Sequence, residues 1–177
     1  MRINVTGNAG SGKSTLSRQL SRELGLPLIE MDRLIWKAGW QKVPKERYQA
    51  QLAPLLQQES WVLDGVSKLA RQQADLIVFL DYPRRVCAWR CAKRNWRYLF
   101  RSRPSLPEGC PEWQIVLTLA NIIIGFPNSA KKAILKDVTE LDSAAVIIKN
   151  TADLAQFRTD VHSFLNERRQ EAEYTPR

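Results

Sequence analysis

Short hydrophobic runs alternate along the chain with longer segments in which apolar residues recur at helical spacing. The runs are residues 3–5, 28–29, 61–63, 76–80 and 144–148. Continuous apolar runs separated by amphipathic segments are typical of a parallel sheet with helices on both of its faces. We therefore expect an α/β fold built on about five parallel strands.

The segments between the runs carry helix and loop signals. Leucines lie four residues apart in residues 16–24, as they do on the buried face of a helix. We expect a C-terminal helix over residues 151–165 and a frayed tail at residues 171–177. Residues 102–111 contain three prolines and one glycine, which predicts an irregular loop.

The composition fits one domain covering residues 1–177, with 44% hydrophobic and 25% charged residues. The formal net charge of +9 favours polyanionic partners such as nucleotide phosphates, nucleic acid or an acidic membrane face. Three cysteines without framework spacing do not indicate a disulfide-stapled secreted protein, so we expect a cytoplasmic one. The longest apolar stretch, residues 115–126, is shorter than the about 20 residues that span a bilayer, and we expect no membrane partner.

A phosphate-binding loop is the most specific motif in the sequence. Residues 7–14 fill every fixed position of the pattern G-x-x-x-x-G-K-[ST], between an expected strand and an expected helix. The glycines let backbone N–H groups face phosphate oxygens, Lys13 supplies a positive charge for catalysis, and the Ser14 hydroxyl is a natural Mg²⁺ ligand. We predict that ATP binds to Gly7, Gly10, Ser11, Gly12, Lys13, Ser14 and Thr15.

Three aspartates follow predicted strands, at the edge of the sheet where magnesium and a phosphoryl acceptor need carboxylates. Asp64 and Asp81 are both candidates for the acidic metal ligand of a P-loop protein, which is called the Walker-B acid. The sequence pattern alone does not decide between them. Asp32 lies on the acceptor side, where a carboxylate can accept the proton of the attacking oxygen. The alternative role for each aspartate is a helix cap or a turn former.

A basic segment without any acidic residue extends from Tyr82 to Pro107. Helical spacing puts four of its arginines on one face, with Trp96 among the residues of another face. Like charges so placed repel one another unless an anion lies between them, and guanidinium groups suit the developing charge of phosphoryl transfer. A solvated basic face and nucleic-acid binding, aided by Trp89 and Trp96, are the alternatives. The four arginines are Arg90, Arg94, Arg97 and Arg101.

Two tryptophans follow Asp32 and belong to the candidate acceptor site. Trp36 and Trp40 would either stack on a planar acceptor such as a base or cover the edge of the sheet. The candidate acceptor-binding residues are therefore Asp32, Trp36 and Trp40.

With these motifs taken together, the chain resembles the adenylate-kinase-related topology modulation proteins, which are small P-loop proteins similar to nucleoside monophosphate kinases. The resemblance extends from Met1 to about Leu165. It rests on residues 7–15, 31–40, 61–65, 79–83 and 109–112.

This resemblance implies a P-loop kinase fold with the strand order 2-3-1-4-5 and a short arginine-rich lid at about residues 90–112. It assigns the Walker-B role to Asp64 rather than Asp81, so that Ser14 and Asp64 would hold the metal. It also places Arg90 and Arg94 on the two arginines that frame the lid. Residues 66–68, Val-Ser-Lys, depart from the Phe-Pro-Arg of monophosphate kinases.

We therefore predict a phosphotransferase that uses ATP and Mg²⁺ and transfers the γ-phosphate to a small acceptor, with a nucleotide among the acceptors considered. Its catalytic residues would be Lys13, Arg90, Arg94 and Asp32. Two alternatives remain: an ATP-dependent regulatory or nucleic-acid-associated protein that affects DNA topology, and a kinase of a non-nucleotide metabolite.

Overall fold

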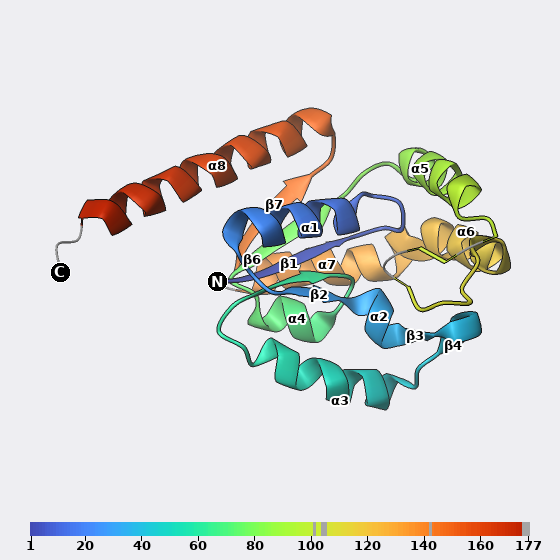
Figure 1. The fold of residues 1–177 in the computed structure, drawn as a ribbon. Helices are drawn as coiled ribbons and strands as arrows, with labels where there is room; N and C mark the ends of the chain where they lie inside the picture. The colour runs from blue at the N-terminus through green and yellow to red at the C-terminus, as the bar shows by residue number, and fades with distance from the viewer. Residues whose placement is uncertain (101, 104–105, 142, 175–177) are drawn as a thin grey trace.

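A parallel five-stranded sheet lies at the centre of the described part of the chain (Figure 1). The computed structural model describes residues 1–100, 102–103, 106–141 and 143–174, with backbone alone at residues 162 and 164–174. The strand order is β2-β5-β1-β6-β7, which is 2-3-1-4-5 when these strands are counted along the chain, as expected. The strands are β1 (Arg2–Gly7), β2 (Leu28–Glu30), β5 (Trp61–Asp64), β6 (Leu76–Leu80) and β7 (Ala144–Ile148).

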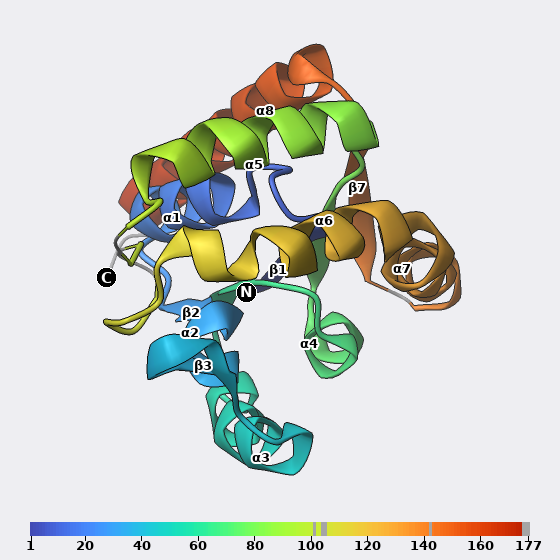
Figure 2. The same cartoon turned by 90° about the vertical axis from the view of Figure 1, so that its right-hand side faces the viewer.

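Helices cover both faces of this sheet (Figure 2). The helices α1, α5 and α8 lie on one side, and α3, α4 and α7 lie on the other. They are α1 (Lys13–Leu24), α2 (Met31–Ile35), α3 (Lys45–Leu56), α4 (Lys68–Gln73), α5 (Arg84–Arg97), α6 (Val116–Gly125), α7 (Ala130–Glu140) and α8 (Thr151–Tyr174). Short 3-10 helices occur at η1 (Ala38–Trp40), η2 (Glu112–Ile115) and η3 (Phe126–Asn128).

The interior strand β6 shows why the sequence contains continuous hydrophobic runs. Val78 and Leu80 join the core beneath α1 and α5, whereas Ile77 and Phe79 point to the opposite side of the sheet. All four side chains are buried. A strand that is covered on both faces needs apolar residues at every position, so no polar alternation remains. Each predicted hydrophobic run is confirmed as one strand of this sheet.

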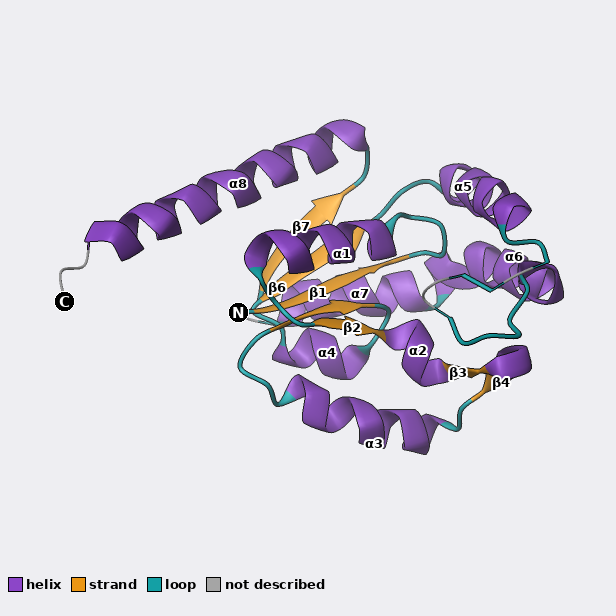
Figure 3. Cartoon of the chain, in the orientation of Figure 1, coloured by secondary structure: helices purple, strands orange, loops and turns teal. Residues whose placement is uncertain are grey.

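Two details differ from the expectations, and a third confirms one of them (Figure 3). An antiparallel pair, β3 (Trp36–Lys37) and β4 (Gln41–Lys42), follows α2 and was not predicted. Helix α8 extends to Tyr174, although the sequence predicted a helix that ends at residue 165 and a frayed tail from residue 171. The last residues of that tail, 175–177, lie outside the described part. The described residues between α5 and η2 form no helix or strand, which confirms the predicted loop there. Within the described ranges, no helix is long and apolar enough to cross a bilayer.

Candidate active site

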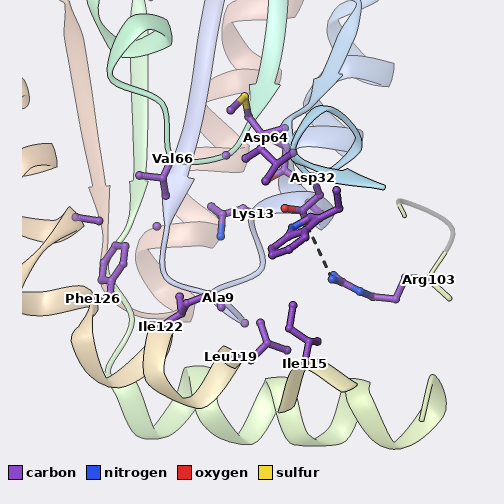
Figure 4. Close-up of a pocket in the computed structure, with 18 of the residues that line it drawn as sticks. Ala9, Lys13, Asp32, Asp64, Val66, Arg103, Ile115, Leu119, Ile122 and Phe126 are labelled. Carbon is purple, nitrogen blue, oxygen red and sulfur yellow. Dashed lines mark ion pairs between the residues drawn. The ribbon is translucent and has the colours of Figure 1, made fainter. Parts of the chain in front are cut away.

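A cavity of about 800 Å³ opens at the carboxyl ends of β1, β2 and β5 (Figure 4). The phosphate-binding loop, α2, α5 and α6 contribute its walls. Except for Ser11, which is buried, every residue that the sequence predicted for the site lines this cavity. These lining residues are Gly7, Gly10, Gly12, Lys13, Ser14, Thr15, Asp32, Trp36, Trp40, Asp64, Arg90 and Arg94.

The phosphate-binding loop is closely packed against α5. Gly10 has a φ of 78°, in the left-handed region that favours glycine. A Cβ at Gly10 would collide with the carbonyl oxygen of Cys87 and would lie 2.9 Å from the Cys91 sulfur. Glycine is therefore required here by both backbone conformation and space. Lys13 Nζ donates a hydrogen bond of 2.9 Å to the carbonyl oxygen of Asn8, which holds its ammonium group over the loop.

Asp64 ends β5 beside the start of α1. Burial raises the pKa of the Asp64 carboxyl, and the charge of Lys13 and a hydrogen bond from Ser14 act in the opposite direction. The side chains of Ser14 and Asp64 thus bring a hydroxyl and a carboxylate oxygen together on the cavity wall. Mg²⁺ is commonly held by one or two protein oxygens together with substrate phosphates and water, so this donor pair fits that ion.

The second Walker-B candidate, Asp81, has a different environment. Its carboxylate accepts a hydrogen bond of 2.8 Å from Lys131 of α7, and its side chain is only 16% exposed. Asp81 is not part of the cavity lining. This geometry favours Asp64 over Asp81 as the acid near the phosphate-binding loop.

The acceptor-side candidates form one wall of the cavity. Trp36 and Trp40 contact each other edge to face, with ring centroids 5.3 Å apart and an interplanar angle of 82°. The Trp40 indole N–H donates a hydrogen bond of 2.8 Å to the carbonyl oxygen of Pro111. Asp32 remains 45% exposed, so its carboxylate is open to a hydroxyl group in the cavity. Both tryptophans line the cavity, and Trp40 connects its wall to the loop before η2.

A buried ion pair beside Asp32 was not predicted from the sequence. The Glu112 carboxylate is fully buried and contacts the guanidinium group of Arg103, which lies 3.9 Å from Asp32 (Figure 4). Arg94 lies 3.9 Å from the other oxygen of Glu112. The sequence offered a partial signal, because Glu112 stood in a family-like motif and Arg103 in the basic segment, but nothing indicated that they meet.

The two arginines assigned to the lid both face the cavity. Arg90 donates a hydrogen bond of 3.2 Å to the carbonyl oxygen of Ser11, and its guanidinium group stacks 4.4 Å from the centre of the Tyr82 ring. Arg94 donates to the side-chain oxygen of Asn95 at 3.2 Å. Arg90 is therefore held against the phosphate-binding loop, and Arg94 is held on α5 with its side chain on the cavity wall.

The rest of the predicted arginine face needs correction. Arg97 is exposed and does not line the cavity, and Arg101 lies outside the described residues. The buried face of α5 consists of Cys87, Cys91 and Asn95, and Trp96, expected on a face other than that of the arginines, is 81% exposed. Close packing against Gly10 accounts for the small residues Cys87 and Cys91 on the buried face.

Apolar residues from η2, α6 and η3 complete the cavity (Figure 4). This wall was not predicted from the sequence, where residues 115–126 indicated only that no segment spans a membrane. Its signal was the helical spacing of the side chains, which puts them on one face. The residues are Ile115, Leu119, Ile122 and Phe126.

Comparisons with known proteins agree with a P-loop kinase fold. The shikimate kinase family model matches residues 9–71, the part that contains most of the phosphate-binding loop and the acceptor-side residues. No curated protein matches the chain.

Three solved kinases share the fold at low sequence identity. Shikimate kinase from Acinetobacter baumannii in complex with shikimate has a TM-score of 0.51 and 17% identity, covering 94% of this chain and 93% of its own. Shikimate kinase from Bacteroides thetaiotaomicron has a TM-score of 0.50 and 21% identity, covering 98% of each chain. Deoxyadenosine kinase from M. mycoides with bound dATP has a TM-score of 0.52 and 13% identity, covering 92% of this chain and 100% of its own.

These likenesses establish the α/β P-loop kinase fold that the sequence predicted. Together with the partial family match, they support an ATP-dependent kinase and leave its acceptor open.

Proposed function

We propose that the protein is an ATP-dependent kinase that transfers the γ-phosphate to a hydroxyl group of a small acceptor. The observation that carries this proposal is the convergence of Lys13, Ser14, Asp64 and Asp32 on one cavity. A phosphate-binding lysine, a metal-type donor pair and an accessible carboxylate are the groups that phosphoryl transfer requires. A cavity of about 800 Å³ lies within the range of small-molecule binding sites.

On the donor side, the backbone of the loop and Lys13 would hold the phosphates of ATP, while Ser14 and Asp64 would hold Mg²⁺. Bound Mg²⁺ would neutralise charge on the phosphates. Arg90 and Arg94 would face the charge that develops on the transferred group, because both line the same cavity as Lys13.

On the acceptor side, Asp32 would accept the proton of the attacking hydroxyl. The acceptor oxygen forms a bond to the γ-phosphorus, and the bond from that phosphorus to the β–γ bridging oxygen breaks, so that ADP leaves. Arg103, 3.9 Å from Asp32, would help to position this carboxylate toward the acceptor.

The comparisons support two classes of acceptor. The shikimate kinase match over residues 9–71 supports a hydroxylated non-nucleotide metabolite. The similarity to a deoxyadenosine kinase fold and the tryptophan pair at the wall keep a nucleoside or nucleotide as the second acceptor class. Both classes present a hydroxyl group to the same carboxylate.

A second candidate function is a nucleic-acid-associated protein that ATP controls. The resemblance to topology modulation proteins implied this role, but the comparisons match shikimate kinases and a deoxyadenosine kinase and do not support that family. The observation in favour of this function is the basic helix α5 with Trp89 and Trp96 exposed on it. In that case ATP hydrolysis would respond to nucleic acid rather than to a small acceptor.

A panel of acceptors tests the proposed function. ADP formation from ATP and Mg²⁺ is measured with shikimate-like hydroxy acids, other hydroxylated metabolites, nucleosides, nucleoside monophosphates and duplex DNA. We expect one small molecule to stimulate ADP release and to appear as its phosphate ester, and Lys13→Ala to abolish both signals. Stimulation by DNA alone, with no phosphorylated product, would contradict the kinase assignment.

A further inference from the structure

Exposed apolar side chains gather on α5, α6 and the residues that join them. Among the described residues, every exposed large hydrophobic side chain except Met1 and Val66 lies between Trp89 and Ile124. The most exposed are Phe100 at 83%, Trp96 at 81%, Leu117 at 80%, Trp89 at 70%, Ile124 at 61% and Trp113 at 56%. A concentration of this kind on a soluble surface marks a binding face.

Most of these residues belong to α5 and α6, two helices that lie side by side (Figures 1 and 2), whereas Phe100 and Trp113 lie in the segment that joins them. At one end, Arg84 of α5 donates a hydrogen bond of 3.4 Å to the carbonyl oxygen of Ile124. At the other end, the N–H of Trp113 donates to the carbonyl oxygen of Leu99 at 3.3 Å. The two helices are thus antiparallel and joined at both ends. We call the exposed side chains of α5, of α6 and of the residues that join them the α5–α6 outer surface, leaving out Ile122, which lines the cavity.

This surface is also strongly basic. Arg85, Lys93 and Arg97 are exposed on α5, and helical spacing puts Arg85, Lys93 and the tryptophans Trp89 and Trp96 on one stripe. From Tyr82 to Lys136 the sequence contains only two acidic residues, Glu108 and Glu112. Because Glu112 is fully buried, it contributes no negative charge to the outside. The partner of this surface is therefore expected to be anionic.

We propose that the α5–α6 outer surface docks on an anionic phospholipid membrane. Trp96, Phe100 and Leu117 would enter the boundary between head groups and acyl chains, while Lys93 and Arg97 would contact lipid phosphates. This attachment is peripheral and requires no membrane-spanning helix.

The aliphatic residues distinguish lipid from the other anionic partners. Aromatic rings stack on nucleic-acid bases, but Leu117 and Ile124 offer no such stacking and gain most from hydrocarbon. A second copy of the chain is disfavoured, because it would bring two basic surfaces of a protein with a net charge of +9 together.

Vesicle binding tests the proposal with the full-length protein. Co-sedimentation and tryptophan fluorescence are measured with phosphatidylcholine vesicles, with and without phosphatidylglycerol. We expect binding and a blue shift only when phosphatidylglycerol is present, since Trp89, Trp96 and Trp113 would leave water. Lys93→Gln with Arg97→Gln should weaken binding by about tenfold or more. Trp96→Ala with Leu117→Ala should weaken it by about tenfold or more as well.

A matched control removes two charges elsewhere. Lys45→Gln with Arg47→Gln changes two exposed residues at the start of α3 and lowers the net charge equally. This control should bind vesicles like the wild type, and thermal unfolding verifies that each variant is folded. Equal losses in the control and the surface variants would overturn the proposal. Binding of a single-stranded oligonucleotide in the absence of vesicle binding would also overturn it. A third contradicting result would be a wild-type protein that does not bind vesicles but forms a dimer, if Trp96→Ala with Leu117→Ala dissociates that dimer.

Discussion

Glu112 and Arg103 form an ion pair in which the carboxylate is fully buried and the arginine side chain is 12% exposed. Arg103 also lies 3.9 Å from Asp32, and Glu112 lies 3.9 Å from Arg94. The pair therefore connects the acceptor-side acid to an arginine of the phosphate side through alternating charges. A change at Glu112 is expected to disturb both sides of the cavity.

The first prediction is that Glu112→Gln lowers the free energy of unfolding by about 3 kcal/mol, because removal of one partner leaves buried positive charge without compensation. Urea denaturation measures the loss. Glu108→Gln is the matched control: it changes an exposed glutamate in the same loop and should alter stability by no more than about 0.5 kcal/mol. Equal stability of the two variants would show that the buried pair contributes nothing.

The second prediction concerns Lys13→Ala. Loss of the ammonium group beside the loop should lower the affinity for ATP with Mg²⁺ and reduce phosphoryl transfer by about a hundredfold or more, while the fold persists. Calorimetry measures the affinity, and circular dichroism verifies the fold. Lys68→Ala, at an exposed position of α4, should leave both quantities unchanged. Wild-type ATP affinity in a folded Lys13→Ala variant would remove the basis of the site.

The third prediction follows from the raised pKa of Asp64. At pH values between the ordinary pKa of an aspartate and this raised pKa, the folded protein binds more protons than the unfolded chain. The free energy of unfolding therefore falls as pH rises through that window, and the deficit persists above it. Asp64→Asn removes the ionisable group, so the ligand-free variant should be more stable than the wild type at neutral pH. Urea denaturation at acidic and neutral pH measures the difference.

The same substitution should weaken metal dependence. Asp64→Asn is expected to require a higher Mg²⁺ concentration for half-maximal turnover, because one of the two donor oxygens is lost. Asp81→Asn serves as the comparison, since it breaks the ion pair with Lys131 and should lower stability by about 1 kcal/mol without changing the Mg²⁺ requirement. If Asp81→Asn alone raised that requirement, the Walker-B assignment would be wrong.

The fourth prediction is that Arg90→Lys or Arg94→Lys lowers turnover by about a hundredfold or more with little change in ATP affinity. Lysine keeps the charge but loses the planar guanidinium group that would face the transition state. Arg97→Lys, an exposed position of the same helix, should behave like the wild type. Normal turnover together with weaker DNA binding in the Arg90 and Arg94 variants would favour the nucleic-acid alternative.

The sequence predicted the strands and the phosphate-binding loop because local residues determine them. A strand covered on both faces, such as β6, requires a continuous apolar run, and the loop requires glycine at positions such as Gly10. The strand order came from the resemblance, since an apolar pattern does not say which strands pair. The features that the residues alone predicted correctly are therefore the ones that depend on short stretches of sequence.

The remainder of the site depends on contacts between distant residues. Trp40 bonds to Pro111, 71 positions away, and the Asn8 side chain donates to the carbonyl oxygen of Ile123. Neither contact leaves a local pattern. The apolar side chains of α6 do show helical spacing in the sequence. Their place in the cavity wall depends on contacts with distant residues, so the sequence indicated only a hydrophobic stretch.

The close packing of Gly10 against α5 has a consequence for ligand binding. Cys87 and Cys91 leave no room at Gly10, Arg90 is bonded to Ser11, and Asn8 is bonded to α6. Helix α5 cannot swing away as a rigid flap without breaking the contacts that shape the phosphate-binding loop. The first half of the expected lid therefore belongs to the fixed base of the site. The entropy of ordering Arg90 is consequently lost during folding and not again when ATP arrives.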